Sequence, residues 1–203
     1  MTSTPEAISI LNSHFPFLRE EDLEEIFLIS QLQQYRKRDR IHEVGDPLNH
    51  VYFLLSGYVR GFIIDSHNND RSTSFRKEGE FFGDPEAVLN RAPSTTAFEV
   101  VESSTVLVTP FFQFQILAST NIRISQLFII GLQKALFYYM EHNRLLLETR
   151  PEVRCDILMG KKPEIFQKVS RKHIATYLGI TPNSLSRILK RKNSKRIENT
   201  LTD

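Results

Sequence analysis

Residues 170–192 read S-R-K-H-I-A-T-Y-L-G-I-T-P-N-S-L-S-R-I-L-K-R-K, a stretch that predicts two short helices separated by a glycine. Ser170 is a good N-cap for the first helix, and Gly179 can adopt the left-handed backbone that ends it. Thr181 caps the second helix, with Pro182 in its first position. Two short helices joined by such a turn are typical of a helix-turn-helix, whose second helix enters the major groove of DNA.

The chain concentrates its positive charge around this stretch. Residues 161–203 contain eleven Lys and Arg against three Asp and Glu, a net charge of +8. Residues 1–160 contain fifteen against twenty-one, a net charge of −6, so that the whole chain carries +2. A basic region around a candidate recognition helix is typical of a nucleic-acid-binding protein. The alternative is a helical hairpin inside an ordinary helical core, and the charge asymmetry argues against it.

The polar side of the second helix supplies the residues that we expect to contact DNA. Asn183 and Arg187 are predicted to read base edges, because Asn pairs bidentately with adenine and Arg with guanine. Ser184 can reach a base or a phosphate. Phosphate contacts set the register of a protein on DNA, and the residues predicted to make them are Arg171, Lys172, Thr181, Ser186, Lys190 and Arg191.

Composition favours a soluble protein without catalytic or metal chemistry. The 203 residues suffice for one large or two small domains, with 40% hydrophobic and 25% charged residues. No run of eighteen apolar residues and no secretory pattern in residues 1–13 is present, so we expect a cytoplasmic protein with no membrane contact. The single cysteine, Cys155, is expected to pack as a small hydrophobe. The six histidines are scattered and no catalytic motif occurs, so we expect no enzyme, no metal site and no cofactor.

Between residues 33 and 109 the apolar pattern changes from a helical to a strand period. After two helical pieces at residues 8–17 and 20–32, short β-type runs alternate with Gly, Pro, Asn and Asp. Runs of this length and spacing predict an antiparallel sandwich or barrel. The predicted strands are Gln33–Arg38, Ile41–Val44, His50–Leu55, Tyr58–Ile64, Arg71–Arg76, Ala97–Glu102 and Ser104–Thr109.

A long helix is predicted from about residue 121 to Leu147, after a short one at residues 111–118. Its apolar residues form two lines, which predicts burial against two surfaces, its own sheet and the same helix of a second copy. Gly131 and Ala135 would let two such helices approach closely. The alternative is a monomer in which this helix belongs to the core. Thr149 is predicted to cap the next helix, so we divide the chain into residues 1–120, 121–148 and 149–203.

The sequence also resembles a known family. Residues 50–60, H-V-Y-F-L-L-S-G-Y-V-R, follow G-D-P at residues 45–47 and precede G-E-F-F-G-D at residues 79–84. This pattern resembles the cyclic-nucleotide-binding β-roll. With the long helix and the helix-turn-helix in this order, residues 10–192 resemble the Crp-Fnr family of bacterial transcription factors.

This resemblance implies an α+β fold with an N-terminal antiparallel β-roll, a dimerisation helix and a C-terminal winged-helix-like helix-turn-helix. It also implies a homodimeric transcriptional regulator that binds double-stranded DNA and has RNA polymerase as a further partner. The β-roll of such a protein senses a small effector.

The ligand motif departs from the family pattern. Family members that bind cyclic AMP carry Phe-Gly-Glu and then Pro-Arg, whose arginine pairs with the cyclic phosphate. Here Pro93 is followed by Ser94, which cannot neutralise a buried phosphate. We therefore expect the β-roll not to bind cyclic AMP, or to bind it with Arg91 in place of the missing arginine. The candidate ligand residues are Phe82, Gly83, Asp84, Arg91, Ser94 and Thr95.

The DNA-reading positions agree with the family only in part. Arg187 matches an arginine of the family's recognition helix, whereas Pro182 and Asn183 stand where Arg and Glu are usual, so we expect a different operator. Two further readings stay open. One is a haem-binding relative that uses Cys155 or a histidine, and the other is a small-molecule-binding module whose helix-turn-helix no longer functions.

Overall fold

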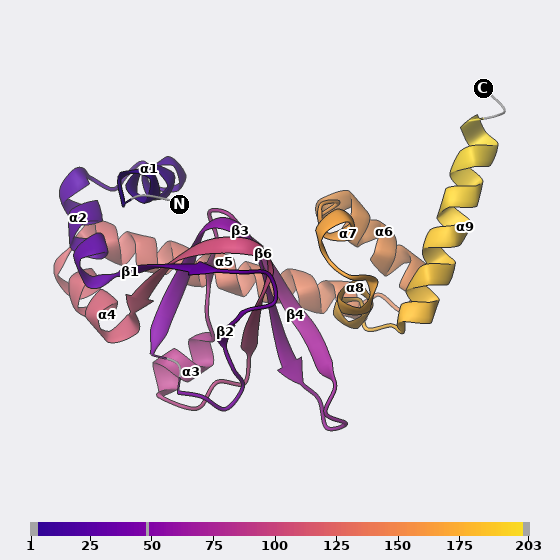
Figure 1. Ribbon diagram of the computed structural model, residues 1–203, viewed down its shortest axis with the longest axis horizontal. Coiled ribbons are helices and arrows are strands. Elements are labelled where there is room, and N and C mark those ends of the chain that lie inside the picture. The colour runs from indigo at the N-terminus through magenta and orange to yellow at the C-terminus, as the bar shows by residue number, and fades with distance from the viewer. Residues whose placement is uncertain (1–3, 48, 201–203) are drawn as a thin grey trace.

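The computed structural model describes residues 4–47 and 49–200 and has the predicted α+β architecture (Figure 1). A sheet flanked by helices forms one end of the molecule, and a group of helices forms the other. The elements in chain order are α1 (Thr4–His14), α2 (Glu20–Ile29), β1 (Gln31–Tyr35), β2 (Arg40–His42), β3 (His50–Ile64), β4 (Asp70–Lys77), β5 (Phe81–Phe82), α3 (Pro85–Asn90), β6 (Ala97–Pro110), α4 (Phe111–Thr120), α5 (Ile122–Leu147), α6 (Pro151–Lys161), α7 (Ile165–Lys168), α8 (Arg171–Tyr177) and α9 (Pro182–Thr200).

The strands form one antiparallel sheet among the described residues. Its main order is β1-β6-β3-β4, with β2 also paired to β6 and β5 to β3. Alternate apolar side chains of β3 and β6 fill the interior, as the period-two pattern predicts. Examples are Leu54, Val59, Val100 and Val106, none of which is accessible to solvent.

Two predicted pairs of strands are single long strands. β3 runs through Ser56 and Gly57, and β6 runs through Ser103, so neither site is a turn. The register between β3 and β6 shifts around Ser56–Tyr58 instead, which is a β-bulge. Gly57 has φ of +97°, and a Cβ there would lie 2.2 Å from the Oγ of Ser104. The glycine that suggests a turn in the sequence therefore permits the bulge.

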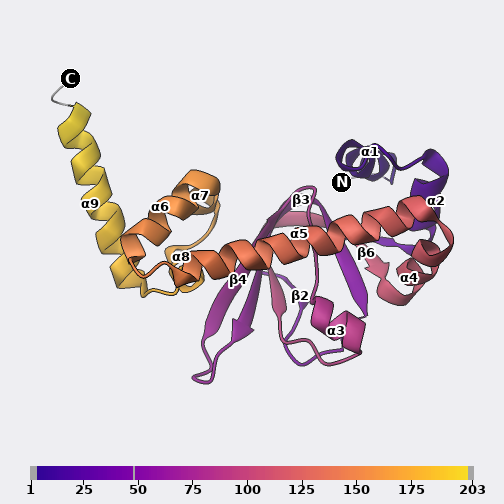
Figure 2. The ribbon, with the colours of Figure 1, turned by 180° about the vertical axis from the view of Figure 1, so that it is seen from behind.

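Helix α5 crosses the sheet and connects it to the C-terminal helices (Figure 2). Asn121 caps it, because its side-chain oxygen accepts a hydrogen bond from the Arg123 amide at 3.0 Å. One side is buried against the chain's own sheet and helices. The second predicted apolar line is exposed in the single chain, and its members are Ile129, Leu132, Leu136, Met140 and Leu147.

The predicted role of Gly131 and Ala135 in helix pairing is not supported by their positions. A Cβ on Gly131 would lie 3.7 Å from the Phe81 ring, and Ala135 lines the same apolar cavity of about 70 Å³ beneath α5. Both residues therefore face the β-roll of their own chain. A helical wheel shows which residues share a line, but it does not show which line the sheet covers.

The C-terminal helices share a core with the sheet. Buried Tyr58 and Phe75 of the sheet pack in one cluster with Ile174 of α8 and Leu185 of α9. Within the described residues 149–200 every regular element is a helix, so the wing implied by the family resemblance does not form there. Helix α9 continues to Thr200.

The predicted cap at Thr149 is wrong. Pro151 is the first residue of α6, so the cap position falls on Arg150, which makes no side-chain cap. Helix α6 runs on through Gly160 to Lys161.

Cys155 is fully buried, and burial raises the pKa of its thiol. Across the described residues we find no cluster of side chains that could hold a metal ion and no helix suited to crossing a membrane.

Candidate nucleic-acid interface

The turn between α8 and α9 is built by hydrogen bonds that the sequence predicts. The Ser170 hydroxyl accepts from the His173 amide at 3.3 Å and caps α8. Gly179 has φ of +64°, and the Ile180 amide donates to the Ala175 carbonyl at 3.0 Å while the Gly179 amide donates to Thr176. This pair of bonds is the Schellman motif, which ends a helix at a left-handed residue.

Helix α9 begins at Pro182, directly after this turn, and presents a polar face. The Ser184 amide donates to the Thr181 hydroxyl at 3.1 Å, as expected of a cap. Leu185 and Ile188 are buried on the opposite side and fix the rotation of the helix. Asn183 and Arg187 are therefore exposed, and neither side chain hydrogen-bonds to any described residue.

The predicted phosphate contacts differ in how free they are. The side chains of Arg171 and Lys190 are exposed and form no ion pair with a described residue. Arg191 pairs with Glu152 of α6 at 2.6 Å, but both side chains are well exposed, so a phosphate can displace this weak pair. Thr181 serves as the cap, and Ser186 is half-buried.

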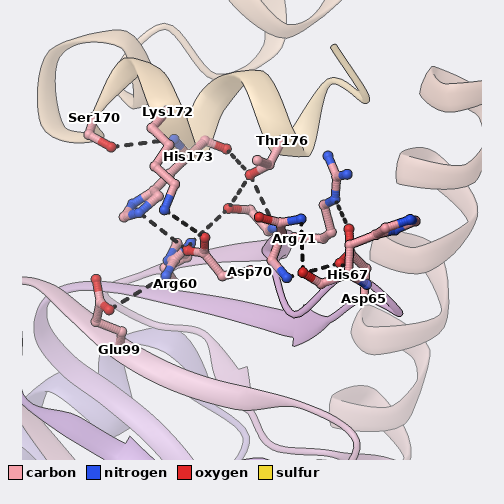
Figure 3. A network of polar contacts seen from close by, with 12 residues as sticks. Arg60, Asp65, His67, Asp70, Arg71, Glu99, Ser170, Lys172, His173 and Thr176 are labelled. Atoms are coloured by element: carbon pink, nitrogen blue, oxygen red, sulfur yellow. Dashed lines mark hydrogen bonds and ion pairs between the residues drawn. The ribbon is translucent and has the colours of Figure 1, made fainter. Parts of the chain in front are cut away.

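Lys172 is held by the β-roll, which the sequence does not predict. Its Nζ lies 2.8 Å from Asp70 at the start of β4. The same carboxylate accepts from Arg60 at 2.7 Å, and Arg60 is only 1% exposed (Figure 3). Beside it, the Thr176 hydroxyl bonds Ser72 at 3.1 Å. These contacts fix the first helix of the helix-turn-helix to the β3–β4 hairpin.

Electrostatics keeps Asp70 charged in this position. Burial alone would raise the pKa of its carboxyl group. The ammonium of Lys172 and the guanidinium of Arg60 outweigh burial and hold the pKa of Asp70 well below its usual value. Nothing in the sequence pattern marks this residue, which appears only as the end of a polar turn.

Four of the six predicted ligand residues lie together, in or beside a cavity of about 450 Å³ between the sheet and α5. Asp84 and Thr95 line it, with Gly83 and Ser94 adjacent. Phe82 does not line this cavity; it stacks on Tyr52 with ring centroids 5.0 Å apart and lines the neighbouring apolar cavity of about 70 Å³ with Gly83 and Asp84. Arg91 is exposed at the end of α3 and does not line the cavity.

The donors that would bind a phosphate there are already used by Asp84. Its carboxylate accepts from the Ser94 hydroxyl at 3.1 Å and from the amide and hydroxyl of Thr95, each at 3.0 Å. It also accepts from the Glu86 and Ala87 amides and so caps α3. Burial raises the pKa of Asp84, but these hydrogen bonds outweigh it and lower the pKa overall. No described Lys or Arg lines this cavity.

Comparison with known proteins agrees with this arrangement. The cyclic nucleotide-binding domain family matches residues 32–121. The anaerobic regulatory protein of Pasteurella multocida is 26% identical over 196 residues, which cover 90% of this chain and 71% of that protein.

Two solved structures share the fold over most of both chains. FixK2 from Bradyrhizobium japonicum has a TM-score of 0.70 at 20% identity and covers 83% of this chain and 87% of its own. A protein assigned to the crp/fnr family of transcriptional regulators from Eubacterium rectale has a TM-score of 0.71 at 13% identity. The match covers 90% of this chain and 88% of that protein. The chain therefore has a cyclic nucleotide-binding domain, and its β-roll, long helix and helix-turn-helix follow in the order that is typical of Crp-Fnr transcriptional regulators, which it resembles over most of its length.

Proposed function

We propose that this protein is a homodimeric, sequence-specific transcriptional regulator that reads DNA with α9 and does not respond to cyclic AMP. The observation that carries DNA reading is the first part of α9. There Asn183 and Arg187 project from a helix whose opposite side is buried in the core, and neither side chain hydrogen-bonds to a described residue. Their donors and acceptors are therefore available for base edges. As a DNA-binding regulator, it would act in the cytoplasm.

The exposed apolar line of α5 supports a dimer. Large apolar side chains along one side of a long helix are costly to leave in water. A second copy of α5 would cover them, and its two-fold axis would place two copies of α9 on DNA. In this arrangement the operator is an inverted repeat whose half-sites lie about one helical turn apart.

The charge of the β-roll cavity supports an effector other than cyclic AMP. Two carboxylates, Asp84 and Glu86, line the cavity, whereas no described cation does. A cyclic phosphodiester would face repulsion there without a charge-assisted donor. The alternative in which Arg91 binds the phosphate is not favoured, because Arg91 lies outside the lining.

Selection of DNA from a random duplex library by the purified full chain tests the proposal. The expected result is enrichment of an inverted repeat, with binding that weakens steeply as salt rises. Titration of cyclic AMP into the same protein should give no heat of binding and no change in DNA affinity. Failure to enrich any sequence would contradict sequence-specific reading, and cyclic AMP binding would contradict the account of Asp84.

A further inference from the structure

Arg76 near the end of β4 is a buried cation without a partner. Its side chain is 7% exposed and forms no hydrogen bond or ion pair with any described residue, and its Nε is fully buried without an acceptor. Its guanidinium lies over the ring of Tyr138, 4.0 Å from the ring centroid. A buried charge without a counter-ion destabilises the folded state, which indicates that the protein gains something from keeping Arg76 charged at this position.

Arg76 lines a cleft of about 860 Å³ between β4, α5 and α6. The cleft shares no lining residue with the cavity of about 450 Å³ between the sheet and α5, but Arg76 and Phe81 also line the apolar cavity of about 70 Å³ that Asp84 borders. The described lining of the cleft contains five cations and two acids. The cations are Arg76, Lys134, Arg144, Lys161 and Lys162, and the acids are Glu80 and Glu141.

The two acids do not neutralise Arg76. Glu141 is paired with Lys161, and Glu80 accepts a hydrogen bond from the Lys77 amide at 3.2 Å. Lys162 also lies over the Tyr138 ring, at 3.9 Å from its centroid. The cleft therefore has a surplus of positive charge around one aromatic ring.

The remaining lining is apolar. Phe81, Phe137 and Ile157 belong to it, so a ligand could bury a planar or apolar portion beside the charges. A guanidinium with neighbouring cations suits the doubly charged phosphate monoester better than a single carboxylate.

We propose that this cleft binds a small organic phosphate, with Arg76 and Lys162 holding its charged group. Its walls come from the sheet, from α5 and from α6 of the DNA-binding part, so an occupant would contact both ends of the molecule. The binding site stands independently of the DNA-reading proposal, because its test measures thermal stability and uses no DNA.

Thermal unfolding of the full chain at constant ionic strength tests this site. The probes are inorganic phosphate and AMP, with sodium chloride as the salt control and succinate as the dicarboxylate. Phosphate and AMP are expected to raise the midpoint temperature, AMP at lower concentration, whereas chloride and succinate are not. An equal effect of succinate would contradict the phosphate assignment.

Variants locate the effect. Arg76→Met replaces the buried charge with an apolar side chain of similar size, so the ligand-free midpoint should hold or rise while the affinity for AMP falls at least tenfold. Lys162→Gln should also lower the affinity for AMP. Lys37→Gln, at an exposed position before β2, is the matched control and should respond like the parent. An unchanged AMP response in Arg76→Met, or no response in the parent, would overturn the proposal.

Discussion

At the scale of single residues, Arg187 and Lys190 are both exposed cations of α9, yet we expect them to contribute differently. Arg187→Ala should cost about 1–3 kcal/mol on the operator and relax one base position. Lys190→Ala should weaken operator and random DNA alike and reduce the salt slope by about 1. Fluorescence anisotropy over a range of salt measures both. Equal losses on the two DNAs for Arg187→Ala would show that it does not read a base.

Asp22 is the residue from which we expect the clearest pH effect on stability. It is fully buried, and Arg123 of α5 donates to it at 2.5 Å. The hydrogen bond from Arg123 outweighs burial and lowers the pKa of Asp22 to about 2. Because this folded pKa lies below the unfolded value of about 4, the stabilisation is complete at neutral pH and is lost as pH falls toward 2.

Asp22→Asn should therefore lower the free energy of unfolding by about 2 kcal/mol at neutral pH and by less in acid. Urea denaturation at fixed protein concentration, at neutral pH and at about pH 3, measures the difference. Glu24→Gln, exposed on the same helix, is the control and should change little at either pH. A loss that stays the same at both pH values would contradict an electrostatic origin.

At the scale of elements, the sequence correctly predicts the caps of the helix-turn-helix but misplaces the start of α6 and predicts strand continuity poorly. Ser170, Gly179 and Thr181 act within a few residues of their own positions, so their capping bonds follow from local chemistry. Gly57 suggests a turn when only its neighbours in the sequence are considered. The bulge that it forms instead depends on Ser104, which is distant in the chain and could not be foreseen. The contacts of Asp84 and Asp70 also depend on distant segments. Sequence spacing therefore could not predict that Asp84 occupies the donors of Ser94 and Thr95, or that Asp70 pairs with Lys172.

Helix α5 carries the prediction that belongs to this scale. Leu136 is 57% exposed in the middle of its uncovered apolar line. Leu136→Glu would place two like charges near the two-fold axis of a dimer, so it should shift the protein to monomer. Light scattering after size exclusion measures the mass, and circular dichroism checks that the helices persist. Gln133→Glu adds the same charge at an exposed polar position of α5 and should leave the mass unchanged.

At the scale of the whole molecule, the predicted contact of Lys172 with a DNA phosphate conflicts with the ion pair that Lys172 makes to the β-roll. Lys172 is a predicted phosphate contact, yet Asp70 holds it at 2.8 Å and Arg60 anchors Asp70 from beneath. DNA binding that uses Lys172 must therefore break its ion pair with the β-roll. If Lys172 contacts a phosphate as predicted, the ion pair with Asp70 opposes DNA binding.

Asp70→Asn should free Lys172 and strengthen binding to operator and random DNA equally, with a salt slope steeper by about 1. The double variant Asp70→Asn with Lys172→Gln should return to the affinity of the parent, because the freed charge is then absent. Arg60 keeps Glu99 at 3.5 Å, so the single variant should lose stability without unfolding. Anisotropy titrations with both DNAs measure the change. If Asp70→Asn binds more weakly than the parent, the contact positions α8 for DNA and does not restrain it.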